Sequence, residues 1–184
     1  MATAAENFII GALQTLRRNK EWAEKAIAQT SNASMHKPLS EDTNSIVIIM
    51  KHIAGNLRSR WTDFLTTDGE KPWRDRDQEF VDDFSSRDQL MEYWESGWSC
   101  LLDTLESLTV EDLDKTVTIR GEPHSVPLAI QRSITHTCYH VGQIMLIART
   151  HFDGDDWHVI SIPRGGSQAY NDRVWGEGHF KPKS

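Results

Sequence analysis

Four long segments with the hydrophobic periodicity of an amphipathic α-helix constrain the fold of this chain most strongly. In each segment, apolar residues recur at steps of three and four positions, which places them on one face of a helix. The segments cover about residues 4–30, 43–66, 86–108 and 127–151. Helices of this length bury their apolar faces against one another, so the pattern predicts an all-α fold built as a four-helix bundle.

Capping and breaking residues set the expected ends of these helices. Ser31 and Asn32 break the pattern after the first segment, and the polar stretch 40–44 offers several N-caps for the second. Ser86 is followed three residues later by Gln89, which resembles a capping box at the start of the third helix. We therefore expect each helix to begin at a polar side chain that accepts a backbone N–H.

The connections between the segments differ in character. Residues 66–83 are polar and contain Gly69 and Pro72, so they are expected to form a long loop. Residues 114–128 alternate apolar and polar positions around a Gly-Glu-Pro sequence, which predicts a short β-hairpin before the last helix. The glycine-rich and polar tail, about residues 152–184, is expected to be extended and to pack over the bundle. Residues 1–184 would then form a single domain.

The charge balance argues against polyanionic partners. The sequence has 27 acidic and 20 basic residues, so its formal net charge is 20 − 27 = −7, and it has no basic run. Such a chain is poorly suited to coat nucleic-acid phosphates or an anionic bilayer. The sequence contains no run of about 18 apolar residues, the length that a membrane-spanning helix needs. We therefore expect neither a nucleic-acid partner nor a membrane partner.

Histidines outnumber cysteines by eight to two, and this imbalance indicates what kind of site the chain could build. Two cysteines, Cys100 and Cys138, exclude a disulfide scaffold and a cysteine-rich zinc module, and they form no CxxC motif. Their scarcity is typical of a reduced intracellular setting, so we expect a cytoplasmic protein. A site made of imidazoles remains open.

The sequence HTCYHVGQ, residues 136–143, is the most specific local motif. His136 and His140 are four positions apart on a predicted helix, so they lie on one face and could share one metal ion. Cys138 is rotated by about 200° from His136 and faces away from the pair. Gln143 returns to the same flank of the helix, where it could support a ligand by a hydrogen bond.

Spacing alone leaves the role of this pair open. A zinc protease motif would need a glutamate directly after the first histidine, and Thr137 occupies that position. HxxxH pairs also occur by chance on exposed helices, so a metal site needs a third ligand. His52, on the flank of the second helix, is the best candidate. From the residues alone, a buried histidine with an ordinary hydrogen-bond partner is the better explanation of His52.

Three stretches of the sequence resemble the DinB-like (DinB/YfiT-like) superfamily, and the resemblance as a whole covers about residues 5–171. The first is IMKHIAGNLRSRW, which carries His52. The second is TVTIRGEPHSVPLAI followed by QRSITHTCYHVGQIMLIA, which carries the HxxxHxGQ motif. The third is SIPRGGSQAYN in the tail, which is similar to a DinB-related group of undescribed function.

The resemblance implies a four-helix bundle, frequently a homodimer, with a divalent metal such as nickel or zinc. On the family pattern the metal ligands are His52, His136 and His140. The superfamily includes metal-dependent hydrolases and transferases that use a low-molecular-weight thiol. Three protein ligands would leave a coordination position for water or substrate, as in catalytic zinc sites.

Three hypotheses follow for function. The first is a metal-dependent enzyme that activates a thiol or water for transfer or hydrolysis. The second is a non-catalytic metal-binding or stress-response bundle, and the third is a dimeric bundle with ordinary structural histidines. Arg164, in an Arg-Gly-Gly turn of the tail, is a candidate substrate contact, although it lacks the P-loop pattern. The sequence identifies no general acid or base, since Asp63 and Glu92 cannot be placed at the site.

Overall fold

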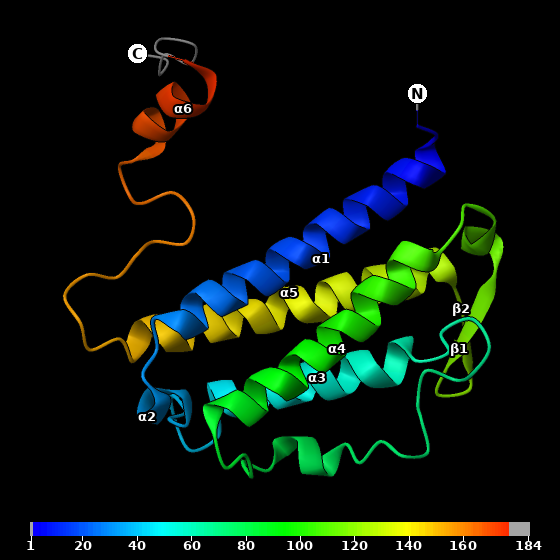
Figure 1. The fold of residues 1–184 in the computed structure, drawn as a ribbon, viewed down its shortest axis with the longest axis horizontal. Helices are drawn as coiled ribbons and strands as arrows, with labels where there is room; N and C mark the ends of the chain where they lie inside the picture. The colour runs from blue at the N-terminus through cyan, green and yellow to red at the C-terminus, as the bar shows by residue number, and fades with distance from the viewer. Residues whose placement is uncertain (1, 177–184) are drawn as a thin grey trace. The chain divides into compact units, whose positions relative to one another are not determined.

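The computed structural model describes residues 2–176 of the chain. These residues form two compact units, separated in sequence after Asp153. Within the described residues, the first unit contains four long α-helices and a β-hairpin, as Figure 1 shows, and the second unit contains one further helix. The predicted all-α bundle with a hairpin before its last helix is confirmed.

Three of the four bundle helices begin and end close to the predicted positions, whereas the second is shorter at both ends than the predicted range 43–66. The four helices are α1 (Ala4–Ala28), α3 (Ile46–Trp61), α4 (Arg87–Ser107) and α5 (Val126–Thr150). Helix α3 packs most extensively against α4, and α1 packs most extensively against α5. The bundle therefore consists of two helix pairs, which can be followed in Figure 1.

The helix starts are fixed by hydroxyl caps, as expected, but the cap of α3 was misplaced. Ser45 accepts the Ile48 N–H, whereas residues 40–44 form a turn, so α3 begins later than predicted. Ser86 caps α4 through the Gln89 N–H. The Gln89 side chain accepts the backbone N–H of Ser85 and not that of Ser86, so the second half of the predicted capping box is shifted by one residue.

The core between α3 and α4 combines large aromatic side chains with one very close backbone approach. Trp61, Trp94 and Trp98 are fully buried. Gly97 faces α3, and a Cβ atom added there would lie 2.6 Å from the Cα of Ala54. Only glycine lets the two backbones come this near, and this contact fixes α3 in position against α4.

The hairpin consists of β1 (Thr116–Ile119) and β2 (Glu122–Ser125), paired antiparallel. Its turn is formed by Arg120 and Gly121, with φ angles of 56° and 76°. Two positive φ angles are typical of a type I′ turn. The predicted Gly-Glu-Pro turn is thus wrong by one position, because Glu122 and the proline after it belong to β2.

Three short helical segments occur in the connections of the first unit. They are α2 (Asn32–Met35), η1 (Asp77–Phe80) and η2 (Glu111–Asp114). The loop predicted over residues 66–83 thus contains one helical turn, η1, which packs against α3. This turn was not predicted, because its residues are mostly charged and show no apolar periodicity.

The second unit begins at Gly154 and contains helix α6 (Ser167–Trp175). The expectation of an entirely extended tail is therefore corrected, since the tail holds a helix that follows directly after Gly166. That the tail packs over the bundle, within a single domain of residues 1–184, stays a prediction, and residues 177–184 lie outside the described part. Among the described helices, none is long and apolar enough to cross a membrane.

Candidate metal centre

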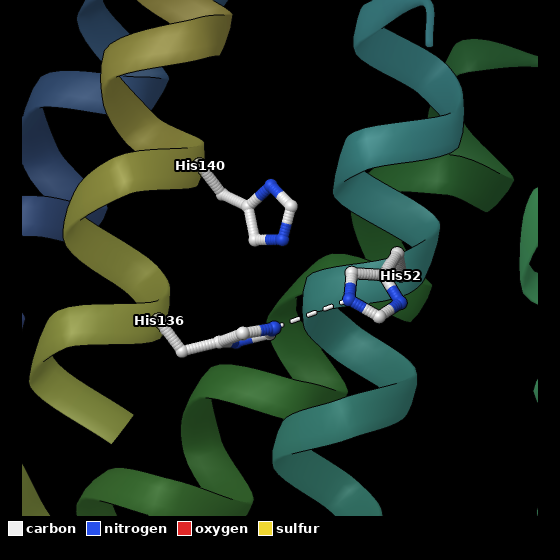
Figure 2. Close-up of side chains that lie close together, drawn as sticks. All are labelled: His52, His136 and His140. Atoms are coloured by element: carbon white, nitrogen blue, oxygen red, sulfur yellow. Dashed lines mark hydrogen bonds between the residues drawn. The ribbon is translucent and has the colours of Figure 1, made fainter. Parts of the chain in front are cut away.

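Three histidines from two helices form a compact cluster in the bundle. His52 comes from α3, and His136 and His140 come from α5 (Figure 2). Each offers one ring nitrogen, and these three atoms lie within 4.8 Å of one another. The expected geometry of the HxxxH pair is confirmed, and the structure brings His52 to it across the bundle. The cluster could hold a metal ion.

Hydrogen bonds at the back of two imidazoles leave their Nε2 atoms for the cluster. His52 Nδ1 lies 2.8 Å from a carboxylate oxygen of Glu79, and His140 Nδ1 lies 2.7 Å from the side-chain oxygen of Gln143. Both oxygens are acceptors, so each Nδ1 is the protonated nitrogen and each Nε2 carries a lone pair. Such partners orient metal-binding histidines and make them better ligands.

The remaining ring nitrogens show how well the cluster fits a cation. His52 Nε2 and His136 Nε2 are 3.1 Å apart, close to the separation of about 3.3 Å expected for two nitrogens on one tetrahedral zinc ion. His140 Nε2 and His136 Nδ1 are buried and have no hydrogen-bond partner among the described residues. Because buried polar atoms are rarely left unpaired, the bare Nε2 of His140 points to a missing partner. Three neutral imidazoles suit zinc, nickel or copper.

The environment keeps two of the imidazoles neutral. Burial, assisted by the nearby His140 and His52, lowers the pKa of His136 to about 3. Burial also lowers the pKa of His140 to about 4, although the hydrogen bond with Gln143 acts in the opposite direction. Neutral imidazole is the form that binds metals, so both ligands are ready for a cation at neutral pH.

These shifts predict how the stability of the metal-free protein depends on pH. Both folded-state pKa values lie below 6.5, the value for an ordinary histidine. Between pH 6.5 and 5 the unfolded chain binds protons that the folded chain does not, so stability is present above pH 6.5 and falls as the pH is lowered. We expect the urea midpoint of chelator-treated protein to fall over this range. A His136→Gln/His140→Gln variant should show a flatter dependence, and equal slopes in the two proteins would contradict the assignment.

Glu79 and Arg74 support His52 and were missed from the sequence. The Arg74 side chain, 2% exposed, forms two hydrogen bonds with Glu79, from Nε to Oε1 at 2.7 Å and from Nη2 to Oε2 at 2.9 Å. Burial alone would raise the pKa of Glu79, but the hydrogen bonds from His52 and Arg74 outweigh it, and the pKa is lowered. Glu79 is therefore a carboxylate that fixes the His52 ring.

A chemical signal for Glu79 was present in the sequence, but it was not specific. Metal-binding histidines usually donate their second N–H to a carboxylate or carbonyl. Residues 66–83 contain many acidic side chains, and nothing in their order indicates which one folds back. Gly55 on α3 makes room for Glu79, because a Cβ atom at that position would collide with the carboxylate.

The other predicted residues are placed as follows. Gln143 contacts His140, three positions before it, and its side chain supports that ring as expected for a neighbour of the site. Asp63 and Glu92 are exposed, and Cys138 is exposed on α5. Arg164 is exposed in the second unit, so its predicted contact with a substrate stays a prediction.

Fold and cluster together define a helical-bundle protein with a candidate metal site. A family model described as "Protein of unknown function (DUF1572)" matches residues 3–166. The chain belongs to this family. Comparisons with curated proteins and with solved structures gave no match.

Proposed function

We propose that this protein is a metal-dependent enzyme of the DinB-like type. A divalent metal, nickel or zinc, would be held by His52, His136 and His140. The observation that carries the proposal is the set of three convergent ring nitrogens, one of which, His140 Nε2, is buried with no partner among the described residues. The DinB-like assignment is supported by the HxxxHxGQ motif and by its place on the last bundle helix.

The proposed reaction is transfer to or from a thiol, or hydrolysis of a small-molecule substrate. When bound, the cation supplies Lewis acidity and lowers the pKa of a thiol or water at an open coordination position. The chain holds its ligands in place, because Glu79 keeps the proton on His52 Nδ1 and Gln143 keeps that on His140 Nδ1. We further propose a homodimer, supported by the exposed apolar side chains of Leu128 and Leu146 on α5.

One observation favours a second candidate, a non-catalytic metal-binding or stress-response bundle. Glu79 is the carboxylate beside the cluster, and it is already engaged by Arg74 and His52. A general base needs a free acceptor near the reacting proton. Glu79 is therefore not available as a general base, which favours the non-catalytic protein.

Metal analysis followed by kinetics separates these candidates. Chelator-treated protein titrated with zinc or nickel is expected to bind one ion per chain. The loaded protein is then mixed with 1-chloro-2,4-dinitrobenzene and several low-molecular-weight thiols, and separately with p-nitrophenyl esters. Metal-dependent turnover in either assay supports the enzyme. Stoichiometric metal without turnover supports the non-catalytic protein, and the absence of metal binding overturns both.

A further inference from the structure

A cavity of about 90 Å³ lies beside the cluster, between α3, α5 and β1. One of its lining residues is His136, so a molecule in the cavity would lie next to the candidate metal ligands. This volume corresponds to about three water molecules at roughly 30 Å³ each, and it is smaller than the cavity of about 150 Å³ that encloses benzene. A short-chain organic molecule therefore fits, whereas an aromatic ring, a nucleotide or a peptide does not.

The apolar part of the lining is rigid. Trp61 and Phe64 stack with ring centroids 4.5 Å apart. The Trp61 indole N–H already donates to the Ser133 hydroxyl at 3.1 Å, and this bond fixes the ring. Both aromatic side chains line the cavity. They provide a flat surface for the apolar portion of a ligand and leave no indole donor free for it.

The polar part of the lining contains donors without partners. Arg132 on α5 and Asn56 on α3 line the cavity, and neither side chain forms a hydrogen bond or ion pair within residues 2–176. A second cation in the lining, Arg60, is held by Glu70 and the Gly69 carbonyl. Glu70 is shared, since it also pairs with Arg120. Arg132 is exposed, so water solvates its guanidinium, and this group remains free to pair with an anion at the mouth of the cavity.

The side chains of Arg132 and Asn56 are chemically suited to bind an anion. A guanidinium offers two parallel N–H groups that match a carboxylate, and an asparagine amide offers two more donors. A cation held at the cluster by three neutral imidazoles would increase the local positive charge further. The cavity is therefore complementary to an anion with a small apolar body.

We propose that the cavity is the substrate subsite and that it binds a small organic carboxylate. Arg132 and Asn56 would hold the carboxylate, and Trp61 and Phe64 would contact the apolar part. The inference rests on the proposed function in one respect, because it takes the ligand to be the substrate of the neighbouring metal site. Binding of the carboxylate itself requires no metal.

The test uses the full-length, chelator-treated protein and three ligands of similar size, propionate, 1-propanol and propylamine. Isothermal titration calorimetry is expected to show propionate binding at least about tenfold more tightly than either the neutral or the cationic analogue. Arg132→Gln and Asn56→Asp should each weaken propionate binding by about tenfold or more. Asn56→Asp is nearly isosteric, so it keeps the test valid if the arginine variant folds poorly.

Arg149→Gln is the matched control, because it removes the same charge from the same helix about 25 Å away. It should leave propionate binding unchanged. No preference for propionate, or a preference that survives both Arg132→Gln and Asn56→Asp, overturns the proposal.

Zinc binding measured on the same samples separates this proposal from the proposed function. If the protein prefers propionate but binds no metal, the carboxylate subsite stands and the metal-dependent activity is wrong. If the protein binds metal without preferring propionate, the metal site stands and the carboxylate subsite is wrong.

Discussion

Replacement of His140 by alanine is expected to weaken zinc or nickel binding by more than about 100-fold. Loss of a group that only supports a metal ligand already costs about 10- to 100-fold in affinity, and His140 supplies a ligand atom itself. Its Nε2 is buried and has no partner among the described residues, so no other group in the structure uses it. Competition with a chromophoric chelator would measure the affinity of the variant and of the wild type.

His36→Ala is a suitable control for this experiment. His36 is an exposed histidine that pairs with Asp82 at 2.6 Å, away from the cluster. Its loss should leave the metal affinity within about twofold of wild type. If His140→Ala binds zinc as tightly as His36→Ala does, the three histidines are structural residues and the metal site is wrong.

Replacement of Glu79 by alanine is expected to lower the free energy of unfolding of the metal-free protein by about 3 kcal/mol. Removing one partner of a buried ion pair typically costs about 3–5 kcal/mol, because the other charge stays buried without compensation. In the variant, Arg74 would still have Glu70 as an ion-pair partner, because Arg74 Nη1 lies 3.5 Å from Glu70 Oε1. We therefore expect a cost at the lower end of that range. Urea denaturation monitored by circular dichroism would measure the change.

Two variants make this result specific. Glu95→Ala removes a glutamate whose side chain is 57% exposed and which pairs with Lys20, and it should cost less than about 1 kcal/mol. Glu79→Gln keeps the shape and one acceptor, so its cost should lie between the two alanine variants. Equal stability of Glu79→Ala and Glu95→Ala would show that Glu79 does not compensate Arg74.

The sequence predicted the helices well because each helix carries the same repeating pattern of apolar residues. The apolar faces of the four bundle helices recur with the helical period over many residues, so local errors average out. The ends were less certain, as α3 shows. Several polar residues could cap it, and only the three-dimensional path of the chain selects Ser45.

The candidate site was predictable only in part, for a related reason. The proximity of His136 and His140 follows from helix geometry alone. The approach of His52 depends on how α3 and α5 are packed, and a resemblance to a known family suggested it. The position of Glu79 beside His52 depends on the path of an irregular loop, and hydrophobic periodicity does not predict such a path. The helix in the second unit, α6, is short and mostly exposed, so it also lacks a clear pattern.

Because the bundle is divided into two helix pairs, a metal ion at the histidine cluster would affect how the two pairs are held together. One pair is α3 with α4, and the other is α1 with α5. His52 belongs to the first pair, while His136 and His140 belong to the second, so the cluster bridges the interface between the two helix pairs. A cation bound there would link the two helix pairs, and its binding free energy would add to the stability of the folded protein. Removal of the cation by a chelator would then weaken the packing between the two pairs and leave the packing within each pair unchanged.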